Sequence, residues 1–158
     1  MTDFKARPNR FPLPPLLLIS TMGAALLLHF TLPIGWAPDQ VGGLMRGTGA
    51  LLIIAAFALD VWAFRTLKRH NTTIMPNKAA SQLAVDGPFA HSRNPIYLGN
   101  VMLCVGAGFL IGSRWFVLAA VALFFMLSQV AIKREEKHLA ANFPDEWEEY
   151  SARVRRWV

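Results

Sequence analysis

The chain has 158 residues, of which 54% are hydrophobic and only 16% are charged, and its formal net charge is +6. Soluble domains carry about 25% charged residues, so this composition argues against an ordinary soluble domain, and the length suits a single domain over residues 1–158. The one cysteine, Cys104, excludes an internal disulfide, and no cysteine or histidine pair has the spacing of metal ligands.

Four apolar segments follow one another along the chain. They cover about residues 13–32, 44–64, 95–113 and 115–132. The first contains no charged residue and is long enough to cross a bilayer core of about 30 Å. Gly112-Ser113-Arg114 predicts a tight turn between the last two. The sequence therefore predicts an all-α fold, an integral membrane bundle of four transmembrane helices with a folded cytoplasmic loop and a C-terminal amphipathic helix.

The first segment follows the basic residues Lys5, Arg7 and Arg10, as the core of a cleaved signal peptide would. A signal core is only about 7–15 residues long, however, and this segment is longer. No small-x-small cleavage site follows it. We therefore expect a retained membrane anchor.

The basic residues indicate the orientation. The N-terminal tail, residues 65–94 and the tail after residue 132 carry 3, 5 and 6 of the 16 Lys and Arg residues. Four spans place all three regions on one side of the membrane. The positive-inside rule then predicts that both termini and the long loop are cytoplasmic, as for a bacterial inner-membrane protein. The positive charge thus needs no nucleic acid to explain it, and the sequence carries no signal for an oligomeric state.

The loop between the second and third spans is long for a helix connection. It contains apolar residues and several turn signals, at Pro76-Asn77, Asp86-Gly87-Pro88 and Asn94-Pro95. We expect it to fold as a cap on the cytoplasmic helix ends. His91, Arg93 and Asn94 form a polar cluster just before Pro95, which suits the first turn of a helix.

The tail after residue 132 continues the fourth helix out of the bilayer as far as Pro144. On this helix Ser128, Ala131, Glu135 and Leu139 share one face. The spacing of Trp147, Tyr150, Val154 and Trp157 then predicts a last amphipathic helix at the membrane surface.

Taken in order, several short motifs resemble the isoprenylcysteine carboxyl methyltransferase family, the broader group that includes membrane phospholipid methyltransferases. They are Gly87-Pro88-Phe89, Arg93-Asn94-Pro95-Ile96-Tyr97-Leu98-Gly99, Glu135-Glu136, Leu139, Phe143, Glu149-Tyr150 and Arg153-Val154. The resemblance covers about residues 65–158. Each motif is short, and their order around a hairpin of two spans carries the signal.

The resemblance implies an S-adenosylmethionine-dependent methyltransferase with an all-helical fold, a cytoplasmic cofactor pocket and a lipophilic or lipid substrate that arrives from the bilayer. Carried over by position, the cofactor-binding residues would be Ser81, Gln82, Leu83, Ala84, Phe89, Asn94, Pro95, Ile96, Tyr97 and Glu135. Methyl transfer is a one-step displacement that needs alignment and a dry site. We therefore predict no catalytic residue and no metal.

Several residues keep two interpretations. Glu135 could hold the cofactor or balance Lys133, Arg134 or Lys137. Arg93 could bind the cofactor carboxylate or a lipid phosphate, or anchor the helix end while Asn94 caps it. Asp60 could be a functional polar group inside a span, or pair with a loop cation. The role of His91 stays open.

The methyl acceptor also stays open. Eukaryotic members of the family carry an arginine at the position of Ala131, and they have more spans. The acceptor could therefore be a lipid amine, a small carboxylic acid, a thiol or another isoprenoid. The alternative to an enzyme is a small non-catalytic membrane transporter or interaction protein. A transporter is expected to place ionisable groups near the bilayer midplane, whereas the polar residues here cluster mainly at the cytoplasmic helix ends.

Overall fold

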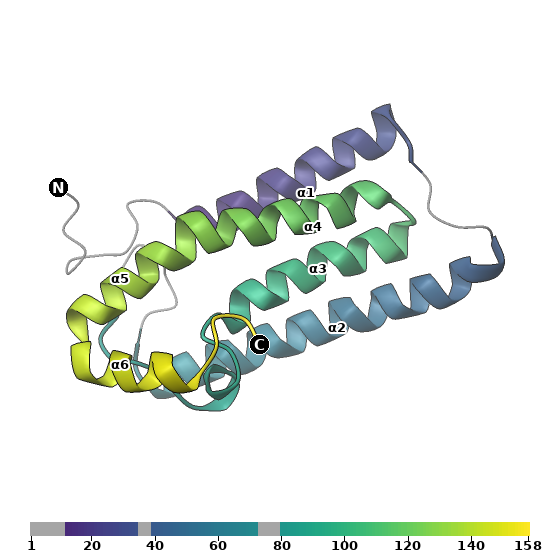
Figure 1. Cartoon of the computed structure of the whole chain (residues 1–158). Coiled ribbons are helices and arrows are strands. Elements are labelled where there is room, and N and C mark those ends of the chain that lie inside the picture. Colours follow the sequence, from purple (N-terminus) through teal and green to yellow (C-terminus); the bar gives the residue numbers. More distant parts are fainter. Residues whose placement is uncertain (1–11, 35–38, 73–79) are drawn as a thin grey trace.

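Four long helices form the body of the molecule. The computed structural model describes residues 12–34, 39–72 and 80–158 (Figure 1). Its long helices are α1 (Leu13–Thr31), α2 (Asp39–Arg69), α3 (Pro95–Ile111) and α4 (Arg114–Met126). Helix α2 packs against α3, α3 against α4, and α4 against α1, so the order in space is α1, α4, α3, α2. The predicted all-α bundle is confirmed.

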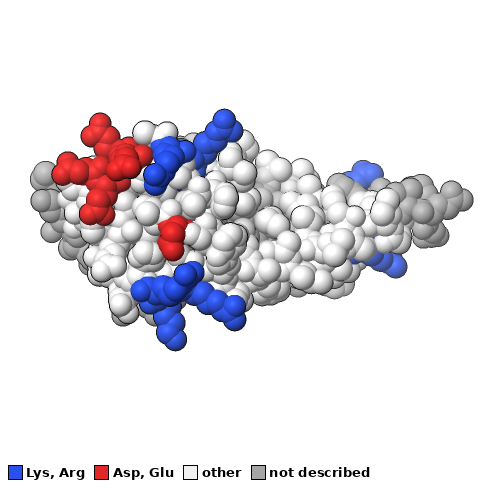
Figure 2. Space-filling view, turned by 90° about the horizontal axis from the view of Figure 1, so that it is seen from below, with Lys and Arg blue, Asp and Glu red and all other residues white. Residues whose placement is uncertain are grey.

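The outer surface of the bundle is apolar, as a surface that faces lipid must be. Large apolar side chains such as Leu27, Phe30, Phe57 and Phe125 are exposed. Helix α1, residues 42–69 of α2, and the continuous helix that starts at α4 are each long and apolar enough to cross a membrane. Figure 2 shows most of the charged side chains at one end of the molecule, then a broad uncharged surface, and a few Lys or Arg side chains near the opposite end.

Helix α3 has 17 residues and is therefore about 25 Å long. It ends at Gly112, whose φ of 78° is left-handed and closes the helix. Ser113 follows as the N-cap of α4, which begins at Arg114. The turn predicted at Gly112-Ser113-Arg114 is present.

The fourth helix is continuous well past the apolar span. Helix α4 leads into a π-helical turn, η2 (Leu127–Ile132), and then into α5 (Lys133–Asn142). The hydroxyl of Ser128 donates a hydrogen bond to the carbonyl oxygen of Phe124 at 2.7 Å, a contact that often bends helices. The sequence predicted the continuation but not the π turn.

The remaining elements gather at one end of the bundle, called the loop end below (Figure 1). They are the segment 80–94, with the 3₁₀ turn η1 (Gly87–Ala90), and the helices α5 and α6 (Pro144–Arg153). The turn η1 packs against α2. The loop therefore forms the predicted cap, although its turn at Pro76-Asn77 lies outside the described residues.

Helix α6 is the predicted C-terminal amphipathic helix, but it is shorter than its apolar spacing suggested. It ends at Arg153, so Val154 and Trp157 lie beyond it. Tyr150 is buried and donates its hydroxyl hydrogen to the carbonyl oxygen of Phe89 at 2.8 Å. Trp157 stacks on Phe124, with ring centroids 4.6 Å apart. Tyr150 and Trp157, two of the residues whose spacing predicted this helix, thus pack against η1 and the fourth helix.

Candidate functional site

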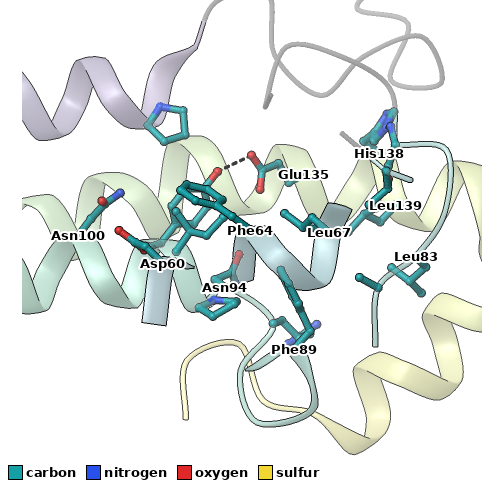
Figure 3. A pocket seen from close by; sticks show the side chains of 18 of the residues that line it. Asp60, Phe64, Leu67, Leu83, Phe89, Asn94, Asn100, Glu135, His138 and Leu139 are labelled. Carbon is teal, nitrogen blue, oxygen red and sulfur yellow. Dashed lines mark hydrogen bonds between the residues drawn. The ribbon is translucent and has the colours of Figure 1, made fainter. Parts of the chain in front are cut away.

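A cavity of about 600 Å³ opens at the loop end of the bundle (Figure 3). This volume is in the range of pockets that enclose a drug-sized ligand. Its walls come from the first residues of α1, the second half of α2, the start of α3, helix α5 and the segment 80–94. Segments far apart in the sequence therefore meet around one space.

Nine of the ten residues that the sequence assigned to a cofactor line this cavity. They are Gln82, Leu83, Ala84, Phe89, Asn94, Pro95, Ile96, Tyr97 and Glu135. The tenth, Ser81, lies outside the lining. Its hydroxyl donates a hydrogen bond to the carbonyl oxygen of Asn71 at 2.9 Å, and its N–H donates to the hydroxyl oxygen of Thr72 at 3.2 Å. Ser81 therefore holds the loop against the end of α2.

Tyr97 and Glu135 join two walls of the cavity. The hydroxyl of Tyr97 donates a hydrogen bond to Oε1 of Glu135 at 2.5 Å, drawn as the dashed line in Figure 3. Tyr97 stands near the start of α3 and is buried, whereas Glu135 stands on α5 just after the π turn. Leu139, one turn further along α5, also lines the cavity. The face predicted for Glu135 and Leu139 is thus the face that meets the cavity.

Glu136, next to Glu135, binds two arginine side chains. Arg156 donates two hydrogen bonds to it, from Nε at 2.9 Å and from an Nη at 2.6 Å. Arg93 lies 3.3 Å from the same carboxylate. The hydrogen bonds to Glu136 raise the pKa of Arg156. Two arginines from distant segments therefore share one acid.

Arg93 makes a further contact besides Glu136, and one of its side-chain nitrogens has no hydrogen-bond partner among the described residues. Its guanidinium lies over the ring of Trp147, 5.5 Å from the centroid, and the residue lines the cavity. Its Nε is buried and has no hydrogen-bond partner among the described residues. Because a guanidinium suits carboxylate and phosphate groups, Arg93, as a lining residue, can serve an anionic group inside the cavity.

A strap, residues Val154–Val158, covers the segment that leads into α3. The side-chain amide of Asn94 donates a hydrogen bond to the carbonyl oxygen of Arg156 at 2.9 Å. The N–H of Arg93 donates to the carbonyl oxygen of Arg155 at 3.0 Å. Asn94 occupies the N-cap position of α3, as one interpretation suggested, but its side chain makes no capping hydrogen bond to the helix. It binds the strap instead.

Several lining residues were not among those that the sequence assigned to the cofactor. They include Phe64, Leu67, Thr72, Asn100, His138 and Tyr150. His138 is buried, and its Nε2 accepts a hydrogen bond from the N–H of Ala80 at 3.2 Å, which fixes the loop above α5. His138 lies one helical turn after Glu135, and this spacing could have identified it. His91 is exposed near Trp62 and is not a lining residue.

Asp60 lines the cavity from α2. None of the ion pairs formed within the described parts of the chain includes it, so the suggested pairing with a loop cation is not present there. Within the same described parts, no group of three or more His, Cys, Asp and Glu residues could hold a metal ion.

A known protein family matches more than half of the chain. The family model for phospholipid methyltransferase matches residues 44–146, which include the last three spans, the capping loop and Glu135. No significant match was found among curated proteins or among solved structures.

Proposed function

The chain belongs to the phospholipid methyltransferase family, and from this premise we propose that it transfers a methyl group from S-adenosylmethionine to a lipophilic acceptor delivered by the membrane. One observation carries the proposal: a single cavity at the loop end is lined by Gln82–Ala84, by Asn94–Tyr97 and by Glu135. The orientation that we propose places this end, both termini and the cavity mouth at the cytoplasm, where the cofactor is available. The whole chain then acts as one domain.

The lining residues fit the chemistry of the cofactor. S-adenosylmethionine supplies an activated methyl group on a sulfonium, next to an amino acid, a ribose and an adenine. The carboxylate of Glu135 can accept hydrogen bonds from an ammonium or a diol, which are strong because they are charge-assisted. The guanidinium of Arg93, which lines the cavity, is suited to a carboxylate. Phe89 and Tyr97 offer aromatic faces to flat or cationic groups.

The remaining lining residues hold the ligands and exclude water. Backbone groups of Gln82, Leu83 and Ala84 can bind an adenine edge, while Pro95 and Ile96 form an apolar wall near the start of α3. Tyr97 fixes the orientation of Glu135 through its hydrogen bond. A displacement reaction needs aligned reactants and a dry site, and these residues provide both.

Calorimetric titration tests the proposal directly. The detergent-purified protein is titrated with S-adenosylmethionine and with its demethylated product, S-adenosylhomocysteine. We expect saturable binding of both. A protein with intact helical circular dichroism that binds neither would contradict the proposal and would favour a non-catalytic transporter or interaction protein.

A further inference from the structure

Asp60 occupies an unusual place in the cavity. Figure 3 shows Asp60 and Asn100 at one end of it, and His138 and Leu83 at the other. Asp60 precedes the end of α2 by nine residues, or about 14 Å, so it lies on the bilayer side of the loop end. A lipophilic acceptor with its alkyl chain among the helices would bring its polar head to this position.

Asp60 is half-buried and takes part in none of the ion pairs formed within the described residues. Its Oδ1 is shielded from solvent and has no hydrogen-bond partner among the described residues. An ionisable group inside a membrane span is costly and usually marks a functional position. The sequence around it is apolar, so the charge does not serve solubility. Because Asp60 lines the cavity, its carboxylate can meet a polar group of a ligand there.

The neighbouring helix leaves room for this carboxylate. Gly99 of α3 faces Asp60, and a Cβ at that position would lie 2.6 Å from Oδ1 and 3.3 Å from Cγ of Asp60. Any larger residue at position 99 would push the carboxylate away. Asn100, the next residue, lines the same end of the cavity with a side-chain amide. Asp60 is thus held between two helices beside a second polar group.

We propose that Asp60 binds the reacting group of the methyl acceptor and takes its proton. The inference rests on the proposed function and extends it to the substrate class. A carboxylate accepts hydrogen bonds and donates none when ionised, and it repels another carboxylate. The acceptor therefore carries hydrogen on its nucleophilic atom, as an amine, a hydroxyl or a thiol does, and is not a carboxylic acid.

With Asp60 as the proton acceptor, every bond and proton in the methyl transfer is accounted for. The acceptor atom uses its lone pair to form the bond to the methyl carbon, and the donor sulfur keeps the electron pair of the broken carbon–sulfur bond. A hydroxyl or thiol gives its proton to the Asp60 carboxylate as this bond forms. An amine arrives as an ammonium ion, so it gives one proton to Asp60 first, which frees the lone pair for the attack. Glu135, held by Tyr97, takes no part in this proton transfer.

A binding experiment without methyl donor tests the acceptor site alone. The protein in nanodiscs is mixed with dodecylamine, dodecanol, dodecanethiol or dodecanoate, and its thermal unfolding midpoint is followed by circular dichroism. We expect at least one of the first three to raise the midpoint more than dodecanoate does, because a ligand that binds the folded state stabilises it. Asp60→Asn should lose the effect of that probe, whereas the matched control Asp145→Asn, at an exposed aspartate of α6, should keep it.

Transfer of labelled methyl from S-adenosylmethionine to the same four probes completes the test. We expect label in a hydrogen-bearing probe, and a rate lower by about 100-fold or more in Asp60→Asn, as for loss of a proton acceptor. Binding of S-adenosylhomocysteine should not change. Three outcomes would overturn the proposal: preferred methylation of dodecanoate, methylation of none of the probes by a protein that binds the cofactor, or a wild-type rate in Asp60→Asn. If the cofactor does not bind but the probe preference persists, the proposed methyl transfer fails while the acceptor site stands.

Discussion

Tyr97 and Glu135 are 38 residues apart in the sequence, yet the hydroxyl of Tyr97 donates a 2.5 Å hydrogen bond to the Glu135 carboxylate inside the cavity. One side chain comes from the start of α3 and the other from α5, so the bond ties the entry of one membrane helix to the exit of another. Both side chains line the cavity.

Removal of the Glu135 carboxylate should weaken cofactor binding. Glu135→Ala is expected to reduce the affinity for S-adenosylhomocysteine by about 1.5–3 kcal/mol, the value of a hydrogen bond to a charged group. Tyr97→Phe should have a smaller effect, because the carboxylate stays but loses its orientation. Calorimetric titration measures both. Glu148→Ala, at an exposed glutamate of α6, is the control, and equal affinities in Glu135→Ala and the control would remove Glu135 from the site.

The two-arginine contact of Glu136 should stabilise the loop end. Glu136→Gln removes the charge that Arg93 and Arg156 share, and we expect it to cost about 1–3 kcal/mol, seen as a lower thermal unfolding midpoint. Glu149→Gln is the matched control, because its 3.8 Å pair with Arg153 is exposed and should contribute about 0–1 kcal/mol. Similar midpoints for the two variants would mean that the network does not stabilise the fold.

The packing of α2 against α3 depends on a close approach at Gly49. A Cβ there would lie 2.6 Å from the carbonyl oxygen of Gly106 and 2.6 Å from the backbone nitrogen of Leu110. Neither atom can move without the helix, so Gly49→Ala should destabilise the bundle by about 1–3 kcal/mol.

Gly47, two residues earlier on the same helix, has open space around an added Cβ. Gly47→Ala should therefore be neutral or stabilising, by up to about 1 kcal/mol of helix propensity. Denaturant titration of the two alanine variants in detergent compares them. Equal losses of stability at both positions would show that the contact between α2 and α3 is looser than described.

The docking of α6 should depend on pH through Tyr150. Burial raises the pKa of Tyr150, whose hydroxyl donates to the carbonyl oxygen of Phe89. A raised pKa in the folded state means that the neutral form is favoured by folding. The contribution of Tyr150 to the free energy of unfolding is complete below the ordinary tyrosine pKa of about 10, and it is lost as the pH rises above that value.

Unfolding midpoints between pH 8 and pH 11 test this dependence against Tyr150→Phe. At pH 8 the variant should be less stable by about 0.5–1.5 kcal/mol, the value of a neutral hydrogen bond. The difference should shrink as the pH rises above 10, because only the wild type has a phenol to ionise at this position. A constant difference across the range would contradict the proposed contribution of Tyr150.

The helices could be predicted from the sequence because their signals are local. An uncharged run of about 20 residues defines α1 by length alone, and Gly112 marks the end of α3 because few other residues adopt its left-handed conformation. The continuation of the fourth helix to Pro144 followed from the same kind of signal. The π turn at Leu127–Ile132 has no such mark, since its residues are ordinary helix formers.

The cavity could be predicted only in part. The nine lining residues assigned in advance came from motifs compared with a family, not from periodicity. His138 and Asn100 were missed because each is an isolated polar residue whose importance depends on what lies opposite. The side-chain amide of Asn94 donates a hydrogen bond to the carbonyl oxygen of Arg156, which lies 62 residues further along the chain. No local pattern predicts such a contact.

The strap also bears on how the protein is made. Arg155 and Arg156, which hold Arg93 and Asn94 in place, follow all four membrane helices in the chain. During synthesis the ribosome releases them only after the helices that line the cavity have been delivered to the membrane. The wall around Asn94 therefore gains these contacts only after α1, α2, α3 and α4 have been synthesised, so the helices are made before this wall of the cavity can be complete.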